Sequence, residues 1–452
     1  MVNRSLERIA GRIGLSEQAV VLANTAGFDR SELVCLPWPE DSALPVLCDP
    51  VRKTLLPVQR TAAGLVFLSP EVPAKGYCCL PFHPEEPSKP DLATPVSSLS
   101  AASHRLENRF WLIELDEQGN LSRILDKIQG RDVLLPGRKG NVFRAFEDKP
   151  MAHQNWDIDI YYQQKSWSLD EATSIEVVEN GPVRAGVRIT RPFLDSVLIQ
   201  TLYLYDQLPR IDFDTFIDWK EDELLLKVEF PVDIHAETAT YDIQFGNLTR
   251  PTHWNTSWDW ARFEVCAHKW ADLSEDGYGV SLMNDCKYGH DIRDSVMRLT
   301  LLKSGLSPNP HADREQHRFV YSLYPHAGGW RQARTMQQAY SLNIPLYAKI
   351  QAAEKTVEST ALPGSFSLCR VDADDHVMLE TVKLAEEGGG LIFRLFEYCN
   401  RRGAVRLTLG YVPKAIEECD LLERTERKLP VIGNTVDFDI KPYEIKSFRI
   451  IF

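Results

Sequence analysis

After its first fifteen residues, this sequence contains almost no stretch with the periodicity of a helix. Short apolar runs separated by turn-forming residues take its place, as at 19–24 and 31–36. Between 210 and 219, apolar and polar residues alternate with period two, which places the acidic side chains on one face of a strand. Many short strands joined by frequent turns predict an all-β protein built from packed antiparallel sheets.

The opening residues are the main exception to the strand pattern. Leu6, Ile9 and Ile13 fall on one face of a helix that ends at Gly14. A lone amphipathic helix needs a surface to pack on. The segment therefore indicates either a missing upstream partner or a mobile terminus, and the residues leave both open.

The remaining chain divides into three expected β-sandwich domains. The first is small, the second is a large twisted antiparallel sandwich, and the third is again small; their expected ranges are 16–98, 99–342 and 343–452. A proline- and serine-rich stretch at 81–100 is expected to connect the first two. A short helix is expected at 330–340, where Ala333, Met336 and Ala339 share a face.

Charge and cysteine content narrow the possible partners and compartment. The net charge is −13 and the sequence has no basic run, only short pairs such as Arg401-Arg402, whereas a nucleic-acid binder normally carries a basic face. We therefore expect neither nucleic acid nor an anionic membrane as a partner. The nine cysteines include no CxxC, which favours reduced thiols. With no secretory signal and no apolar run of about 20 residues, we expect the cytoplasm.

Paired acids make 146–162 the richest segment for chemistry. If 156–162 is a strand, Asp157, Asp159 and Tyr161 share one face. Neighbours on such a face lie about 6.5–7 Å apart, within the range of about 5–10 Å between the paired carboxylates of glycosidases. The alternative is that these are ordinary acids on the solvent face of a strand.

Two further segments could contact sugars. The stretch 252–264 holds Trp254, Trp258 and Trp260, which could form a sugar platform, although a structural aromatic cluster at a domain junction is the favoured interpretation. The polar turn within 282–291 could offer hydrogen bonds to hydroxyl groups, or it could be an ordinary loop. His253, His290-Asp291 and His311-Ala312-Asp313 form no spaced cluster, so we predict no metal site.

Four stretches carry a family resemblance, in order along nearly the whole chain. The runs 250–265 and 283–289, the F-E-D-x-P…W-D-x-D pattern within 146–162, and the ending 442–448 resemble the cytosolic α-mannosidases of glycoside hydrolase family 38. The resemblance implies a large galactose mutarotase-like supersandwich flanked by two smaller β-sandwiches. It also implies that residues 1–15 are the end of a helical bundle.

The resemblance further implies a supporting role for this chain. The family's enzymes are retaining hydrolases of terminal α-mannosides, and their Asp nucleophile and single zinc-type ion lie upstream of the part matched here. We therefore assign no catalytic residue, metal ligand or cofactor to this chain, and expect it to be inactive alone. Its expected partners are its own N-terminal catalytic barrel and helical bundle, and a mannose-containing oligosaccharide. An uncovered barrel-facing apolar patch could also drive homo-oligomer formation.

Side chains of this part are expected to line the rim of the substrate cleft. The candidates for substrate binding are Asp148, Trp156, Asp157, Asp159, Asn284, Lys287 and Tyr288. Two other functions stay open: a stand-alone glycan-binding protein without catalysis, and a different glycosidase that uses Asp157 and Asp159 as its acid and nucleophile.

Overall fold

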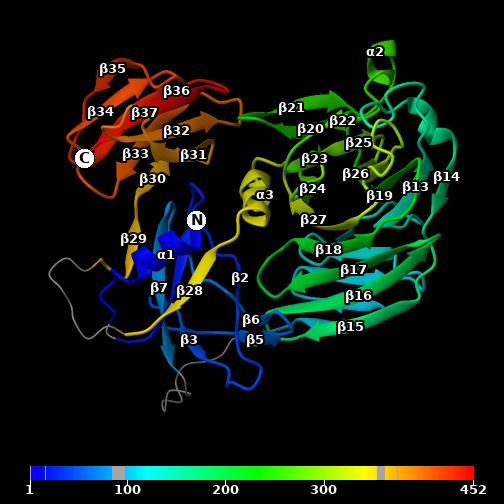
Figure 1. The fold of residues 1–452 in the computed structure, drawn as a ribbon, viewed down its shortest axis with the longest axis horizontal. Coiled ribbons are helices and arrows are strands. Elements are labelled where there is room, and N and C mark those ends of the chain that lie inside the picture. The colour runs from blue at the N-terminus through cyan, green and yellow to red at the C-terminus, as the bar shows by residue number, and fades with distance from the viewer. Residues whose placement is uncertain (1, 16, 84–96, 354–361, 374) are drawn as a thin grey trace. The chain divides into compact units, whose positions relative to one another are not determined.

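The structure is a computed structural model that describes residues 2–15, 17–83, 97–353, 362–373 and 375–452. Over these residues it is almost entirely antiparallel β-structure, which confirms the all-β expectation (Figure 1). The chain forms two compact units: unit 1 comprises 1–96, 244–246 and 344–452, and unit 2 comprises 97–243 and 247–343. None of the described helices has the length and apolar character needed to span a membrane.

Unit 2 contains two large antiparallel sheets. The nine-stranded sheet consists, in spatial order, of β15 (Ser174–Asn180), β16 (Arg184–Phe193), β17 (Ser196–Tyr205), β18 (Ile211–Asp218), β27 (Gln316–Ala327), β24 (Tyr278–Asn284), β23 (Trp270–Glu275), β20 (Thr238–Ile243) and β21 (Gly246–Pro251). The six-stranded sheet consists of β14 (Ser166–Ser168), β13 (Val142–Glu147), β19 (Leu224–Pro231), β26 (Val296–Ser304), β25 (Gly289–Arg293) and β22 (Val265–Cys266).

Smaller elements complete unit 2. A five-stranded sheet runs β12 (Arg131–Asp132), β11 (Leu121–Asp126), β10 (Trp111–Leu115), β9 (Arg105–Glu107) and β8 (Ser100–Ala102). The helical elements are η1 (Ile160–Gln164), a single 3-10 helix, and the α-helices α2 (Ser257–Trp260) and α3 (Thr335–Asn343). The short helix expected at 330–340 thus forms slightly later in the chain.

Aromatic side chains join the two large sheets across the core. Phe213 of β18 stacks on Tyr321 of β27 with ring centroids 4.9 Å apart, and it lies 5.7 Å from Phe230 of β19 in the other sheet. Alternation along β18 sends Ile211, Phe213 and Ile217 into this core. The period-two pattern read from the sequence therefore fixes which face of β18 is buried.

The outer face of the six-stranded sheet is unusual because it is also covered. Every residue of β19 is buried, on both faces of the strand. Leu224, Leu226 and Val228 point into the core between the sheets. Leu225, Lys227 and Glu229, at the alternating positions, lie on the outer face beneath other parts of unit 2. This covered polar face positions the site described below.

Unit 1 contains two further pairs of sheets. In the first pair, one sheet consists of β28 (Tyr347–Gln351), β1 (Ala19–Asn24), β7 (Gly76–His83), β3 (Val46–Cys48) and β4 (Leu55–Leu56), with β29 (Ser365–Ser367) beside β7. The other sheet consists of β2 (Leu33–Leu36), β6 (Gly64–Leu68) and β5 (Val58–Thr61). In the second pair, one sheet consists of β30 (Cys369–Asp372), β33 (Gly403–Leu409) and β36 (Thr435–Ile440). The other sheet consists of β31 (Val377–Leu384), β32 (Leu391–Glu397), β37 (Ile445–Ile451), β34 (Ala415–Cys419) and β35 (Thr425–Leu429).

Segments distant in sequence meet in unit 1. β28 and β29, which the sequence division places in the third domain, pair with β1 and β7 of the first. The helix α1 (Val2–Ala10) buries Leu6 and Ala10 in a cluster with Val21 and Tyr77. Its apolar face is therefore packed within unit 1. Most of the connection expected at 81–100 falls outside the described residues.

We predict that Phe213→Ala lowers the free energy of unfolding of unit 2 by about 3–5 kcal/mol, because it leaves a cavity between stacked rings. Tryptophan fluorescence during urea unfolding reports chiefly on this unit, since Trp38 is the one tryptophan of unit 1. Val177→Ala, at a half-exposed position of β15, is the control and should cost less than about 0.5 kcal/mol. Equal destabilisation by the two variants would contradict the assigned core.

Candidate functional site

The acidic segment that the sequence singled out is a loop and not a strand. After β13, the chain turns at His153, which has a left-handed φ of 52° and accepts hydrogen bonds from the N–H groups of Trp156 and Asp157. The expected strand over 156–162 is replaced by this turn and by η1. Asp157, Asp159 and Tyr161 therefore do not share a strand face, and the geometric basis for an acid pair there is lost.

Asp148 anchors this loop from beneath. Its side chain is buried and pairs with the ammonium of Lys303 on β26. The same ammonium donates to the carbonyl oxygen of Gln154 at 2.7 Å. Burial raises the pKa of Asp148 above its ordinary value, although the hydrogen bond and charge of Lys303 act in the opposite direction. Asp148 thus holds the loop to the sheet from within the protein.

The far side of the loop faces solvent. Asp159 accepts a hydrogen bond from the Met151 N–H at 2.8 Å, which closes the loop on itself. Trp156 is 71% exposed, its ring lies 6.1 Å from that of His153, and Asp157 beside it is exposed too. A held aromatic face with an adjacent carboxylate can stack on the C–H face of a pyranose and accept hydrogen bonds from its hydroxyl groups.

The second predicted group belongs to the other large sheet. Asn284, at the end of β24, is fully buried, donates to the His268 carbonyl at 2.9 Å and accepts from the Lys287 N–H at 2.7 Å. The Lys287 ammonium lies 4.6 Å from the centre of the Phe319 ring. Both side chains thus stabilise the turn itself. Tyr288 is the candidate that presents a half-exposed ring.

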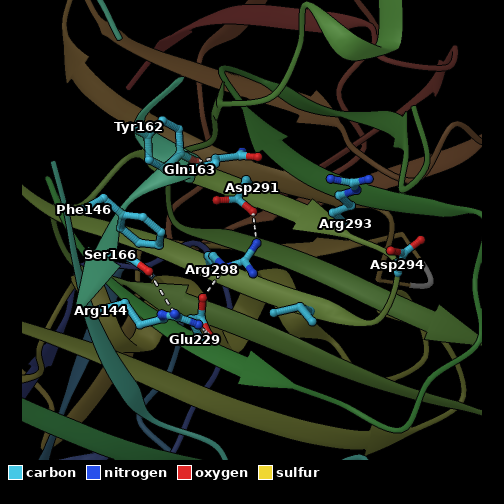
Figure 2. Close-up of a pocket in the computed structure, with 11 residues that line it drawn as sticks. Arg144, Phe146, Tyr162, Gln163, Ser166, Glu229, Asp291, Arg293, Asp294 and Arg298 are labelled. Atoms are coloured by element: carbon cyan, nitrogen blue, oxygen red, sulfur yellow. Dashed lines mark hydrogen bonds and ion pairs between the residues drawn. The ribbon is translucent and has the colours of Figure 1, made fainter. Parts of the chain in front are cut away.

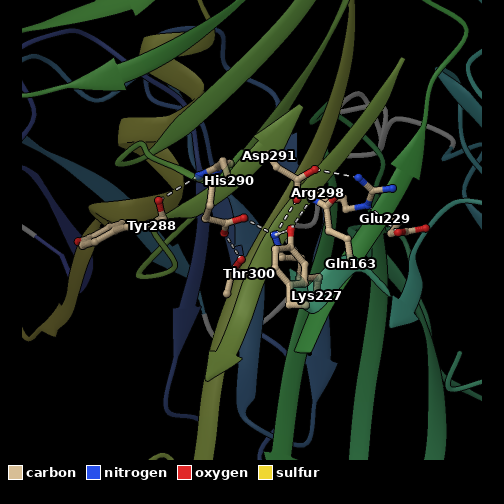
Figure 3. A network of polar contacts seen from close by, with 10 residues as sticks. Gln163, Lys227, Glu229, Tyr288, His290, Asp291, Arg298 and Thr300 are labelled. Carbon is tan, nitrogen blue, oxygen red and sulfur yellow. Dashed lines mark hydrogen bonds and ion pairs between the residues drawn. The ribbon is translucent and has the colours of Figure 1, made fainter. Parts of the chain in front are cut away.

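A charged network that the sequence analysis missed lies on the outer face of the six-stranded sheet (Figure 3). At its centre, the fully buried Lys227 ammonium donates to the Tyr162 hydroxyl at 3.0 Å and to Asp291 at 2.6 Å, and it also pairs with Glu264. Arg298 extends the chain of charges, bonding Asp291 at 2.8 Å and Glu229 at 2.6 Å. Strands β19, β25 and β26 are thereby joined by side chains as well as by backbone.

The pKa values in this network follow from burial opposed by charge. Burial alone would raise the pKa of Asp291, but Lys227 and Arg298 outweigh it and hold that pKa below its ordinary value. Burial alone would lower the pKa of Lys227, but Asp291 and Glu264 keep it above its usual range. The pKa of Glu264 is raised by burial despite Lys227. Burial lowers the pKa of neighbouring His290 to about 4, so this histidine is neutral at pH 7.

Beside the network, the sheet surface is hollowed to a cavity of about 330 Å³ (Figure 2). Its charged lining comprises three arginines and three carboxylates: Arg144, Arg293, Arg298, Glu229, Asp291 and Asp294. Phe146 and Tyr162 form the wall at one end of the cavity. Their rings make an edge-to-face pair with centroids 5.2 Å apart. A signal for this face exists in the sequence, because Lys227 and Glu229 alternate with apolar residues in an otherwise apolar strand.

The tryptophan-rich segment does not form one packed cluster. A capping box of Thr256 and Asp259 starts α2, on which Trp258 is 74% and Trp260 48% exposed. Trp254 makes a different contact, because the Arg293 guanidinium lies 3.8 Å from the centre of its ring. The favoured interpretation of a structural aromatic cluster is therefore wrong for Trp258 and Trp260.

Two family models match this chain. The glycosyl hydrolases family 38 C-terminal domain matches residues 106–311, and the glycosyl hydrolases family 38 C-terminal beta sandwich domain matches residues 376–448. The first range covers most of unit 2, including the loop and the charged network, and the second lies within unit 1.

Curated relatives share sequence over most of the chain. Alpha-mannosidase 2C1 of Homo sapiens is 36% identical over 96% of this chain and 40% of its own length. Alpha-mannosidase G of Dictyostelium discoideum is 35% identical over 76% of this chain and 32% of its own length. The chain thus spans 40% or less of these two relatives. Among solved structures, an alpha-mannosidase from Enterococcus faecalis V583 has the same fold, with a TM-score of 0.77 at 17% identity over 99% of this chain and 58% of that one.

We predict that Lys227→Met destabilises unit 2 by about 3–5 kcal/mol, because it leaves Asp291 and Glu264 buried without their shared cation. Urea unfolding followed by tryptophan fluorescence measures the change. Lys220→Met, which breaks a partly exposed pair with Asp218, is the matched control and should cost no more than about 1 kcal/mol. A Lys227→Met variant as stable as this control would disprove the central role of the network.

Burial of neutral His290 predicts a specific pH dependence. In the unfolded chain His290 binds a proton below about pH 6.5, whereas in the folded chain it binds one only below about pH 4. The free energy of unfolding therefore falls as the pH is lowered from about 6.5 to about 4. The full effect is on the order of 3 kcal/mol. In His290→Gln this decrease in stability between about pH 6.5 and about pH 4 should disappear, whereas His104→Gln, at an exposed position, should keep it. Parallel stability curves for wild type and His290→Gln between pH 4 and pH 7 would refute the prediction.

Proposed function

The chain belongs to glycosyl hydrolase family 38, and we propose that it serves as the β-sandwich region of an α-mannosidase that hydrolyses terminal α-mannosides. In this proposal, the region packs beside the catalytic domain and lends side chains to the rim of the substrate cleft. Support comes from the two matching family models and from the alpha-mannosidase names of the relatives. The chain by itself is proposed to be inactive, and the whole enzyme to work in the cytoplasm.

The loop between β13 and η1 is the observation that carries this proposal. Asp148 and Lys303 fix its base, Asp159 closes it, and the His153 carbonyl holds the backbone of Trp156 and Asp157 at the surface. A preformed aromatic platform binds a sugar without the entropic cost of ordering a flexible loop. Trp156 is proposed to stack on a mannose ring, and Asp157 to accept hydrogen bonds from its hydroxyl groups.

Catalysis itself is assigned to the remaining part of the enzyme. The nucleophile and one zinc-type divalent ion are proposed to reside in an N-terminal barrel, which would be a partner of this chain together with a helical bundle. Among the residues that the structure describes, no group of three or more His, Cys, Asp or Glu side chains is arranged to hold a metal ion. In this proposal, residues of this chain bind and orient the substrate.

In the longer polypeptide, Trp156→Ala and Asp157→Ala should each lower kcat/KM for an aryl α-mannoside by about tenfold, corresponding to ~1.4 kcal/mol of lost binding in the transition state. The melting temperature should not change, because both side chains are exposed. Trp167→Ala, at the half-exposed tryptophan beside Lys165, is the control and should keep wild-type kinetics. Wild-type kinetics in both loop variants would remove this loop from the cleft.

A further inference from the structure

We propose that the hollow on the outer face of the six-stranded sheet is a second carbohydrate site, which accommodates one neutral hexopyranose unit. The site is separate in its side chains from Trp156 and Asp157, and it does not depend on the proposed role of the loop. Its lining comes from β13, β14, β19, β25, β26, the turn between β25 and β26, and η1, so it is built mainly on strands (Figure 2).

The size of the hollow limits its occupant. A cavity of about 330 Å³ stands at the lower end of ligand-binding pockets, which span about 300–1,000 Å³. This volume suits a molecule of monosaccharide size and excludes the burial of a whole oligosaccharide. A longer glycan could place one terminal or branch unit there.

The charges of the lining favour a neutral ligand. Three arginines face three carboxylates, so the lining carries no net charge. Arg298 is committed to Glu229 and Asp291 on its two sides, and Arg144 lies 3.8 Å from Glu229. A phosphate would have to compete with these carboxylates for the guanidinium groups. Sugar hydroxyls avoid that competition because each can donate to a carboxylate and accept from a guanidinium.

Hydrogen-bonding capacity is left over in this lining. Among the residues that the structure describes, the buried Nε of Arg144 has no hydrogen-bond partner, while its Nη2 donates to the Ser166 hydroxyl at 2.9 Å. A guanidinium has five N–H donors and a carboxylate about four acceptor positions, so the pairs within the lining do not exhaust either kind.

The lining is also held in place before any ligand arrives. Lys227 fixes Asp291 and Tyr162, and Arg298 fixes Glu229 and the second oxygen of Asp291. Phe146, packed edge-to-face on Tyr162, adds an apolar wall against which C–H groups of a pyranose can lie. Side chains with fixed rotamers lose little entropy on binding, which suits a weak but selective site.

The test is sugar binding by the 452-residue chain itself. Saturation-transfer NMR and calorimetry with D-mannose, D-glucose and D-galactose should detect millimolar binding of at least one of these hexoses. Arg144→Gln and Asp294→Asn should each weaken it at least about tenfold, the loss expected for a hydrogen bond to a charged group. Both variants must melt at the wild-type temperature, which is expected because neither residue belongs to the hydrophobic core.

Two controls separate this site from other sources of binding. Arg318→Gln breaks a mostly exposed arginine pair with Asp214 on the nine-stranded sheet and should leave the affinity unchanged. Trp156→Ala should also leave it unchanged, whereas its effect on hydrolysis tests the loop alone. Absence of binding for all three hexoses, binding that survives both pocket variants, binding lost in Trp156→Ala, or displacement of the sugar by inorganic phosphate would each overturn the proposal.

Discussion

One buried cation organises the side of unit 2 on which the candidate sites lie. Lys227 has no exposure to solvent, and its ammonium is shared between Asp291, Glu264 and the Tyr162 hydroxyl. Transfer of such a group out of water costs several kcal/mol, which the surrounding charges must offset. The arrangement therefore tolerates little displacement, and it fixes η1 and the segment before β22 against the sheet.

The contacts of Lys227 restrain both candidate surfaces, the loop that presents Trp156 and the hollow on the six-stranded sheet. The loop that presents Trp156 starts at the buried Asp148 and ends in η1, whose Tyr162 touches Lys227. The hollow uses Asp291, one of the carboxylates that Lys227 holds. Surface loops are normally among the mobile parts of a β-sandwich. Here the loop is anchored at both ends and one wall of the cavity is a hydrogen-bonded strand.

The sequence predicts the fold class well because strand alternation and turns are local signals. Residues 211–218 illustrate this, since their period of two marks the face of β18 that enters the core. Residues 156–162 show the limit of the same signal. Their alternation mimics a strand, but Ile158 packs in a small cluster with Phe146, Tyr162 and Leu225 that only tertiary structure creates. The turn at His153 then directs the chain into η1.

The charged face could not be located from the sequence for a different physical reason. Lys227, Asp291 and Arg298 come from three strands, and antiparallel register alone brings them together, as in the pairing of Asp291 with Arg298. What the sequence does show is a lysine and a glutamate in an otherwise apolar strand. Such residues are buried only with partners, so their presence in β19 implies a second set of charges on the neighbouring strands before those strands are known.

The candidate residues in the family-like motifs fall into two groups, one buried and one exposed to solvent. Asp148 and Asn284 are almost fully enclosed and satisfy neighbouring donors and carbonyls, so both side chains support the backbone. Trp156 and Asp157 belong to the same kind of motif but face solvent. A motif read from sequence cannot separate these roles, because an anchor and a ligand-binding group use the same side chains. Exposure separates them, because an enclosed side chain supports the fold, whereas an exposed one at the tip of the loop is accessible to a ligand.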